Sequence, residues 1–470
     1  MKTGYGFALI VLSTHLAQPA TPPLSKTDLA RLRGSTPTPP AWYLTGNLGT
    51  LPGTHFVGTR DNRPLELKVN GQRVLRLEPK DRGNANILGG SPLNQIAAGA
   101  YGSVVAGGGG LIPCEQADME EDCGDDDALP FYSLPQVMNG SLSFIGGGAG
   151  NRVNGFFGVI VGGQENSIQF EPTQYQTYSS FHCAILGGRR NGMTNSYLCS
   201  ILGGKENRMG GYSDVSESVI GGGRQNHIRY GNSATISGGY NNYIHGQFCA
   251  IGGGYANSIE SVTGREVIPE SGDNRLFSTI PGGFNNSVRA DFCFAAGSLA
   301  NADHNGVFIW SDRSAEASFA SQRPNEFAAR ATGGVRFVTG NGTGVELPPG
   351  GGSWASLSDR NAKENLQPVN TREILQKVAA LPLQIWNYKT QPTNVWHLGP
   401  TSQDFSAAFG LGEDAKHITS IDADGVALAA IQGLHEMLLE KNAEIQQLKT
   451  SLAALQEQIS AVSKKMDPAR

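Results

Sequence analysis

A short motif is repeated through the middle of the chain, and it constrains the fold more than any other feature. The motif has the pattern small–x–apolar–x–Gly–Gly–x–x–Asn–x–apolar, as in CAILGGRRNGM, CSILGGKENRM and ATISGGYNNYI. Its asparagines stand at positions 151, 166, 191, 207, 226, 242, 257, 286 and 301, so the basal spacing is 15–16 residues. A unit of this length is too short for two helices, but it fits one coil of two short strands and two turns. The repeat therefore predicts a β-solenoid over residues 85–303.

Each position of the unit has a physical interpretation. The two glycines give the backbone freedom at one corner, and asparagine suits a turn, where its side chain binds backbone or stacks on its neighbours. The first position is always small, which indicates crowding. The residues there are Ala85, Ser103, Ser143, Gly158, Cys183, Cys199, Ser218, Ala234, Cys249, Ser278 and Cys293. Three coils around a common axis would need small residues at that axis. We therefore expect a mainly β fold, a trimeric β-roll or solenoid, followed by an α-rich domain and a coiled coil.

The six cysteines contain no Cys-x-x-Cys pair, so the sequence gives no sign of a zinc site, and we expect no metal and no cofactor. Four of them occupy the first position of the repeat, where a cysteine serves as a small buried residue. The other two, Cys114 and Cys123, flank an acidic loop and could form a disulfide in an exported protein. Seven acidic residues gather there, and they fit either a solvated loop or a weak cation site. They are Asp118, Glu120, Glu121, Asp122, Asp125, Asp126 and Asp127.

Composition excludes two classes of partner. The net charge is −5, so the chain has no basic excess with which to neutralise nucleic-acid phosphates. It also has no internal apolar run of about 18 residues, so we expect no membrane span. Residues 1–20 combine one lysine with a short apolar stretch, which fits either a signal peptide or an unordered arm, and we assign residues 1–42 to a signal-like or disordered segment.

Two segments beside the repeat predict β-hairpins that cap it. Residues 63–76 and 323–338 each alternate apolar residues around an Asn-Gly or Gly-Gly turn. We therefore assign a cap to residues 43–84 and a second cap or neck to 304–345. A Gly/Pro-rich linker follows at 346–357.

Three insertions interrupt the regular spacing of the repeat, and the two longer ones form loops at residues 169–181 and 260–277. Insertions into a solenoid form loops on one face, so we expect these two to contact any receptor.

Helical patterning replaces the glycine-rich repeat from Ser358 onward. Four blocks follow in order: SDRNAKENL, LPLQIWNYK, HLGPTSQDF and DADGVALAAIQGL. They resemble the intramolecular chaperone domain of phage tailspikes and endosialidases, whose members are self-cleaving serine peptidases. The repeat itself resembles the left-handed β-roll heads of trimeric bacterial adhesins, which implies a trimeric left-handed β-roll or solenoid. The first resemblance implies a chaperone and auto-processing domain over residues 358–432 that cuts the Leu357–Ser358 bond. Ser358 would be the nucleophile, Lys363 the base, and Asp359 a helper or structural residue.

A Ser–Lys pair can cleave a peptide bond, because a serine hydroxyl is a weak nucleophile until a base activates it, and a desolvated lysine can be that base. The alternative is an ordinary N-cap at Ser358 and Asp359, with Lys363 in solvent. At Asn361 and Ala362 the sequence departs from the family pattern, so a domain that keeps the fold without cleaving also remains open.

Two further residues match a block of the same family, His397 and Gln403. We expect a structural role for both.

The last part of the chain predicts a coiled coil over residues 433–463. Its apolar residues alternate by three and four positions, interrupted by Lys441. They are Ile431, Leu434, Leu438, Ile445, Leu448, Leu452, Leu455, Ile459 and Val462. This pattern permits a trimer, and a single amphipathic helix packed on its own chain is the alternative.

These features together predict a trimeric fibre- or adhesin-like surface or tail protein. Its C-terminal module would trimerise the chain, assist folding and then cut itself off. The partners would be two further copies of the chain and a cell-surface or glycan receptor, and the location would be extracellular, on a bacterial surface, or on a virion. Two alternatives remain: a structural fibre with an inactive module, and a glycan-cleaving tailspike, which would need paired carboxylates on the β scaffold.

Overall fold

The computed structural model describes residues 41–80, 83–113, 131–171, 180–260, 277–340 and 343–466. The predictions made for residues 1–40, Cys114, Cys123 and the acidic cluster lie outside these ranges. The described chain divides into two compact units. One runs to Ile309 and includes residues 317–328, and the other comprises residues 310–316 and the chain from Ala329 onward.

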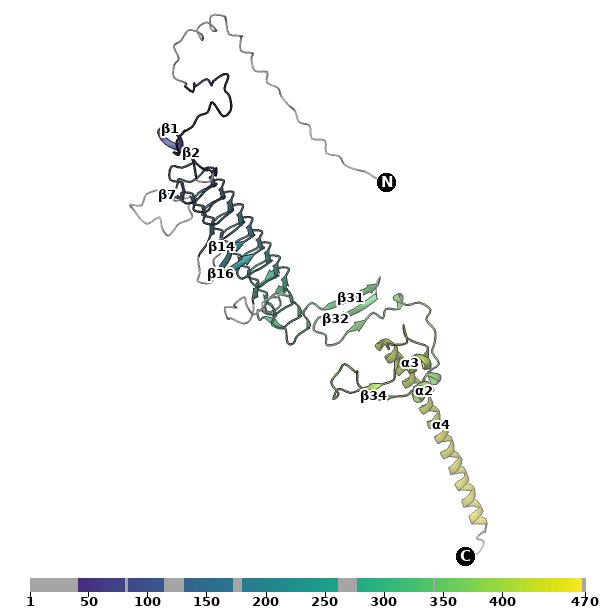
Figure 1. Ribbon diagram of the computed structural model, residues 1–470. Helices are drawn as coiled ribbons and strands as arrows, with labels where there is room; N and C mark the ends of the chain where they lie inside the picture. The colour runs from purple at the N-terminus through teal and green to yellow at the C-terminus, as the bar shows by residue number, and fades with distance from the viewer. Residues whose placement is uncertain are drawn as a thin grey trace, which may run out of the picture. The chain divides into compact units, whose positions relative to one another are not determined.

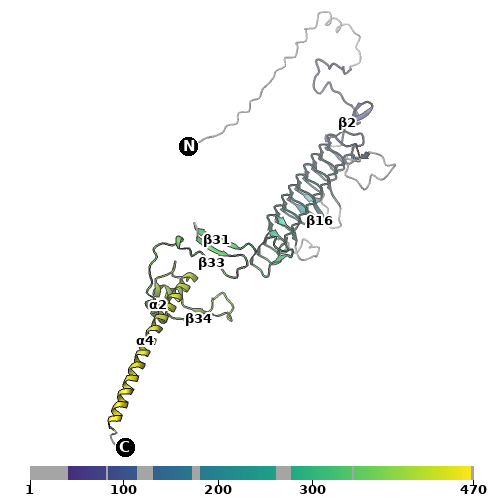
Figure 2. The same ribbon diagram turned by 180° about the vertical axis from the view of Figure 1, so that it is seen from behind.

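The first unit is a β-solenoid of about twelve coils, which confirms the predicted mainly β fold (Figures 1 and 2). Each coil adds one short strand to each of two parallel sheets. The first sheet consists of β3 (Asn86–Gly89), β5 (Val104–Val105), β9 (Phe144–Ile145), β11 (Val159–Ile160), β13 (Ala184–Ile185), β15 (Ser200–Ile201), β17 (Val219–Ile220), β19 (Thr235–Ile236), β21 (Ala250–Ile251), β23 (Thr279–Ile280), β26 (Phe294–Ser298), β28 (Phe308–Ser311) and β30 (Phe327–Arg330), with β24 (Gly283–Phe284) beside β26. The second sheet consists of β4 (Gln95–Ile96), β8 (Val137–Met138), β10 (Arg152–Val153), β12 (Ser167–Gln169), β14 (Gly192–Tyr197), β16 (Arg208–Ser216), β18 (His227–Ile228), β20 (Tyr243–His245), β22 (Ser258–Glu260), β25 (Ser287–Val288), β27 (Ala300–Ala302) and β29 (Phe319–Ala320).

The interior of the solenoid is a double row of aliphatic side chains from one chain. The second residue of a short strand in the first sheet points inward and faces its counterpart in the second sheet, as Ile185 and Met193 do. These side chains are at most 2% exposed from Ile145 to Val288. The parallel register stacks the same position of successive repeats, so that Ile201, for example, lies between Ile185 and Ile220. Burial of one such side chain contributes about 1.5–3 kcal/mol, so each coil adds a similar increment.

The small residues at the first position of the repeat lie inside this same interior. Cys183, Cys199 and Ser218 are at most 1% exposed. The Sγ atom of Cys183 lies 3.1 Å from the carbonyl oxygen of Ser196, and burial raises the pKa of this thiol to about 12. The interpretation that the small residues face an axis shared by three chains was therefore wrong, because one chain buries them completely. The assignment of Ala85 to this position was also wrong by one residue, since Asn86 occupies it.

A ladder of buried asparagines runs along one corner of the solenoid. Asn207 is typical: its Oδ1 accepts from the backbone N–H and the Nδ2 of Asn226, at 3.0 and 3.1 Å. Its Nδ2 donates to the carbonyls of Gly203 and Gly223, both at 3.0 Å. The backbone bond repeats over an insertion, because Asn286 donates to Asn257 at 3.0 Å although 29 residues separate them. The predicted asparagine ladder is confirmed.

The second glycine of each pair is required by this corner. Gly204 has φ +87°, and a Cβ there would lie 2.1 Å from the carbonyl oxygen of Gly223 in the next coil. The same holds along the ladder, so no larger residue fits where neighbouring coils touch.

The structure has a hairpin at the predicted N-terminal segment but not at the predicted C-terminal one. Strands β1 (Leu65–Val69) and β2 (Gln72–Glu78) form an antiparallel hairpin through an Asn-Gly turn, and β2 continues the first sheet. Residues 323–338 are not a hairpin, because β30 belongs to the solenoid sheet whereas β31 (Val335–Gly340) pairs with β32 (Thr343–Leu347). Part of the predicted linker is also a strand, since β33 (Ala355–Ser356) pairs with β32. A two-stranded sheet, β6 (Leu111–Pro113) with β7 (Phe131–Ser133), lies beside the first coils.

The C-terminal segment contains three α-helices and a small hairpin. A 3-10 turn, η4 (Arg360–Ala362), precedes α2 (Thr371–Ala380), and β34 (Gln384–Trp386) pairs with β35 (His397–Gly399). Helix α3 (Ser402–Phe409) follows, and α4 (Ser420–Met466) has 47 residues. Helix α4 passes without a break through residues 432 and 433, where we placed a domain boundary.

Helices α2 and α4 pack on each other at a glycine. A Cβ on Gly433 would lie 2.4 Å from the carbonyl oxygen of Thr371, so the helix backbones approach more closely than an alanine would permit. The contact is flanked by a hydrogen bond from the Thr371 hydroxyl to Glu436 at 3.0 Å and by an ion pair between Arg372 and Glu440.

A substitution in the middle of the ladder tests how much the ladder contributes to stability. In Asn226→Ala, the backbone N–H and Nδ2 of Asn242 lose their acceptor, and two glycine carbonyls lose their donor. We expect the free energy of unfolding to fall by about 2–5 kcal/mol, because buried polar groups without partners cost about 1–3 kcal/mol each. Urea denaturation followed by circular dichroism measures the change. Asn154→Ala, at an exposed asparagine, is the control and should shift the midpoint little.

Two glycine-to-alanine substitutions in α4 should have opposite effects. Alanine is favoured over glycine in a helix by about 1 kcal/mol, so Gly425→Ala, which meets no atom within 4 Å, should be neutral or stabilising. Gly433→Ala should destabilise the helical segment by about 1–3 kcal/mol, because its Cβ overlaps Thr371. Thermal unfolding followed at the helical circular dichroism signal separates them. Equal stabilisation by both would contradict the close packing of α2 on α4.

Candidate functional site

The chain leaves regular structure immediately before the predicted cleavage bond. Strand β33 ends at Ser356, and Leu357 follows with 47% of its surface exposed. The bond between Leu357 and Ser358 therefore lies in an extended, accessible stretch between β33 and η4. Such a stretch can deform as an attacking group approaches its carbonyl carbon.

The turn that follows brings Ser358 and Lys363 together. Nζ of Lys363 donates a hydrogen bond to Oγ of Ser358 at 2.7 Å. The 3-10 turn between them reverses the chain, with the N–H of Lys363 bonded to the carbonyl oxygen of Arg360 at 3.2 Å. The structure thus places the proposed nucleophile and its proposed base within hydrogen-bond distance.

Asp359 has a structural role in this turn. It is the N-cap of η4, and its carboxylate accepts the N–H of Asn361 at 3.0 Å. The alternative of an N-cap at Ser358 and Asp359 with Lys363 in solvent is thus met in part, because Asp359 caps η4 and Lys363 is exposed, whereas the cap of α2 is Asn370. The hydroxyl of Ser358 is instead held by Lys363.

The dyad is open to solvent in a single chain. Ser358, Asp359 and Lys363 are all exposed. An ammonium group must lose its proton before it can act as a base, and removal from water is the usual way to favour the neutral amine. A single chain supplies the contact between the two groups but not this desolvation.

The two other residues of interest lie in the hairpin and in α3. His397, on β35, pairs with Trp386 on β34, and its Nε2 lies 2.9 Å from Oε1 of Gln391. Its ring also packs on Trp386, with centroids 4.8 Å apart. Gln403 accepts from the hydroxyl of Ser402 at 3.2 Å. These contacts fit the structural role that we predicted for both residues.

The described residues show no second chemical centre. Among them, no group of three or more His, Cys, Asp or Glu side chains is arranged to hold a metal ion. No helix among the described residues is long and apolar enough to cross a membrane. Sequence analysis missed the contact of Gly433 with Thr371, which fixes α4 against α2; a glycine within a helical pattern was the only available signal.

Comparison with known proteins gives one match. A search of curated proteins returned none. A family model described as the chaperone of endosialidase, peptidase S74, matches residues 358–410, from the serine of the dyad to the residue that caps α3. The match covers three of the four sequence blocks noted above, together with both members of the Ser358–Lys363 pair. Residues 358–410 of this chain therefore match the chaperone-of-endosialidase family.

Proposed function

We propose that this chain is the subunit of a trimeric fibre- or adhesin-like tail or surface protein that removes its own C-terminal chaperone. The observation that carries the proposal is the 2.7 Å contact of Lys363 with Ser358 at the first residues of the chaperone domain. The solenoid is the part that remains after cleavage. Such a protein acts on a virion or outside the cell.

The proposed reaction needs only groups of this chain and water. Lys363, as a neutral amine, takes the hydroxyl proton while Oγ of Ser358 attacks the carbonyl carbon of Leu357. The C–N bond breaks, the ammonium returns the proton to the nitrogen of Ser358, and an ester joins Leu357 to Oγ. Water then hydrolyses the ester, which leaves a carboxylate on Leu357 and a free amino group on Ser358. The product is the fragment 358–470, of 113 residues.

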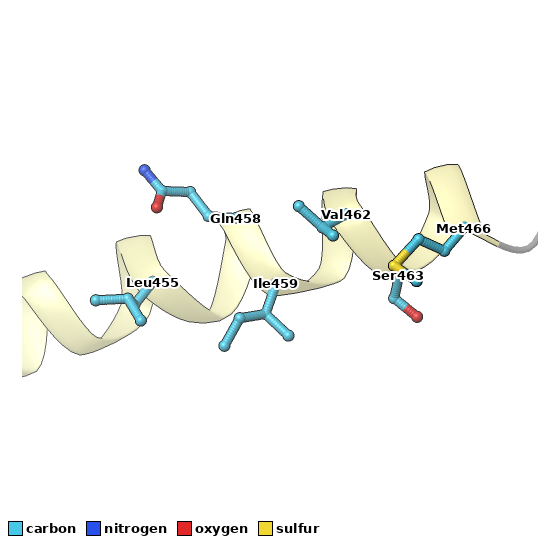
Figure 3. Close-up of a pocket in the computed structure, with 6 residues that line it drawn as sticks. All are labelled: Leu455, Gln458, Ile459, Val462, Ser463 and Met466. Atoms are coloured by element: carbon cyan, nitrogen blue, oxygen red, sulfur yellow. The ribbon is translucent and has the colours of Figure 1, made fainter.

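The surface of α4 supports association into trimers. The apolar residues from Ile431 to Val462 that follow the heptad spacing are 46–63% exposed, so the chain itself does not cover them. Figure 3 shows the end of this stripe, where Leu455, Ile459, Val462 and Met466 line an open groove along the helix. The alternative of a helix packed on its own chain does not account for these exposed residues. Helices with such a stripe associate so that the apolar residues interlock.

Trimerisation also supplies what the dyad lacks in one chain. Two further subunits beside α2 and η4 would exclude water from Lys363 and favour its neutral form. Cleavage would then follow assembly, and the mature trimer would lose the segment that assembled it. Such a product is kinetically stable: it unfolds slowly, because the module that assisted its folding is gone and can no longer assist its unfolding.

The first prediction concerns the nucleophile. Freshly expressed protein should yield a fragment of 113 residues that begins at Ser358, and Ser358→Ala should remain at full length. Intact mass under denaturing conditions measures both. Ser353→Ala, at an exposed serine five residues upstream, is the control and should be cut normally. If the unmodified protein also stays whole, the processing module is inactive and the chain is a structural fibre.

The base is tested in the same assay. Lys363→Arg keeps the positive charge, but a guanidinium group cannot lose its proton, so we expect no cleavage. Lys389→Arg, at an exposed lysine of the same domain, should be cut like the unmodified chain. Normal cleavage of Lys363→Arg would show that this residue is not the base.

The second prediction concerns the helix stripe. Leu452→Asp places a carboxylate among apolar side chains of the proposed coiled coil and should shift the full chain from trimer to monomer, with loss of cleavage. Ala443→Asp, on the opposite side of the same helix, should leave both unchanged. Sedimentation equilibrium measures the mass in solution. Equal masses for the two variants would argue against a coiled coil through this stripe.

A further inference from the structure

The first glycine of most repeats has no explanation within its own chain. At Gly107, Gly147, Gly162, Gly187, Gly203 and Gly238, φ is not positive, and an added Cβ would meet nothing within 4 Å. The second glycine of each pair differs, since Gly204 has φ +87° and would overlap the next coil. At these six positions neither backbone geometry nor neighbouring atoms of the chain require the first glycine. The first glycines of three other coils, Gly222, Gly253 and Gly282, have φ between +148° and +154°, which favours glycine by itself. An unneeded glycine also weakens the coil, because it loses more conformational freedom on folding than other residues do.

These glycines border a sheet face that carries no charge. The outward residues of the first sheet are the second and fourth of each unit, and from Val104 to Pro281 all are apolar, hydroxyl-bearing or glycine. They are Val104, Ala106, Phe144, Gly146, Val159, Val161, Ala184, Leu186, Ser200, Leu202, Val219, Gly221, Thr235, Ser237, Ala250, Gly252, Thr279 and Pro281. We call these residues and the first glycines the glycine face. Several of its large side chains, such as Val161, Leu186 and Leu202, are about half exposed.

The outward side of the second sheet has a different chemistry. Its exposed positions include Arg152, Arg208, Glu260 and Arg289. Charged residues also occupy the corner that follows the glycine pair, as Lys205 and Arg224 do, so between Val104 and Pro281 the uncharged side is the outward face of the first sheet. A solenoid that faced only water would have no reason to keep one face free of charge. The contrast indicates that the glycine face is covered by something to which its backbone must come close.

We propose that the glycine face is the surface through which the solenoids of two other copies of this chain pack in register. The inference rests on the proposed trimer and assigns its interface within the solenoid. Two features of the glycine face select a copy of this chain over another partner. Its pattern repeats with every coil, about every 4.8 Å, and a second solenoid has the same spacing. In addition, in-register packing sets each residue close to its own counterpart, where identical charges would repel, and the face has none.

The size of the face explains why it would act together with α4. Nine coils extend over about 40 Å, and four residues of each coil over about 13 Å, which gives about 500 Å² per subunit. A stable interface between separate proteins buries about 800 Å² per partner. The face is therefore too small to hold free chains together. Chains already joined at α4 meet it at high effective concentration, which makes a face of this size sufficient.

Cysteine cross-linking in the full chain tests the proposal, in a Ser358→Ala background that retains α4. Gly203→Cys should form a disulfide between subunits on mild oxidation, because packed glycines place their Cα atoms within the roughly 7 Å that a disulfide spans. The rate should not depend on protein concentration. Gly192→Cys, at a glycine on the outward side of the second sheet in the preceding coil, is the matched control and should not cross-link. Mass spectrometry of the linked peptides excludes the native cysteines.

A second pair of substitutions, both in one coil, is a control in case the side chain added by Gly203→Cys disturbs the packing. Leu202→Cys should cross-link, and Arg208→Cys should not. A trimer by sedimentation in which neither Gly203→Cys nor Leu202→Cys cross-links would overturn the assignment of the glycine face and leave the proposed trimer intact. Cross-linking at Gly192→Cys and Arg208→Cys instead would assign the interface to the second sheet. A monomer by sedimentation would overturn the proposed trimer, and the glycine face with it.

Discussion

From Asn151 to Asn286, each coil of the solenoid is tied to the next by a buried asparagine whose side chain forms bonds in both directions. The Oδ1 atom of Asn207 accepts two hydrogen bonds from Asn226, and its Nδ2 donates to glycine carbonyls of its own coil and of the next. Because all of these groups are away from water, leaving one unpaired is costly. The aliphatic rows, the parallel register and the close contact at the second glycine all require that this corner stays in line. Proteins that stack short coils gain stability only from neighbours, so a ladder that crosses every interface supplies cooperativity along the stack.

Much of this architecture could be predicted because the repeat is short and strict. The period of 15–16 residues predicted a coil of two short strands. The apolar positions predicted which residues are buried, and the recurrent asparagine predicted the ladder. The small first position was harder to interpret, since crowding has the same signature whether it arises within a chain or between chains. Cys183 and Ser218 show that one chain is sufficient. The segment at 323–338 was wrongly predicted to be a hairpin, because alternating apolar residues do not show which strand a given strand pairs with. In the structure β30 pairs within the solenoid sheet.

The candidate site was predictable as a pair of residues but not as an environment. Ser358 and Lys363 were identified through the family pattern, and their contact follows from a single turn between them. The cap at Asp359 and the packing of Gly433 against Thr371 depend on tertiary geometry, which sequence spacing does not reveal. In a single chain η4 is exposed, so no group of that chain removes the lysine from water.

The ladder bond across the longest gap has the same length as the bonds between adjacent coils. Asn286 donates to Asn257 at 3.0 Å over 29 residues, and Asn242 donates to Asn226 at 3.0 Å over 16. The residues that maintain the stack are therefore independent of how much chain leaves a coil and returns to it. Loop closure itself costs little more as a loop lengthens. A solenoid built in this way can carry inserted segments of different length and sequence while the framework keeps its dimensions, so that the loops and the shape are determined by separate parts of the same sequence.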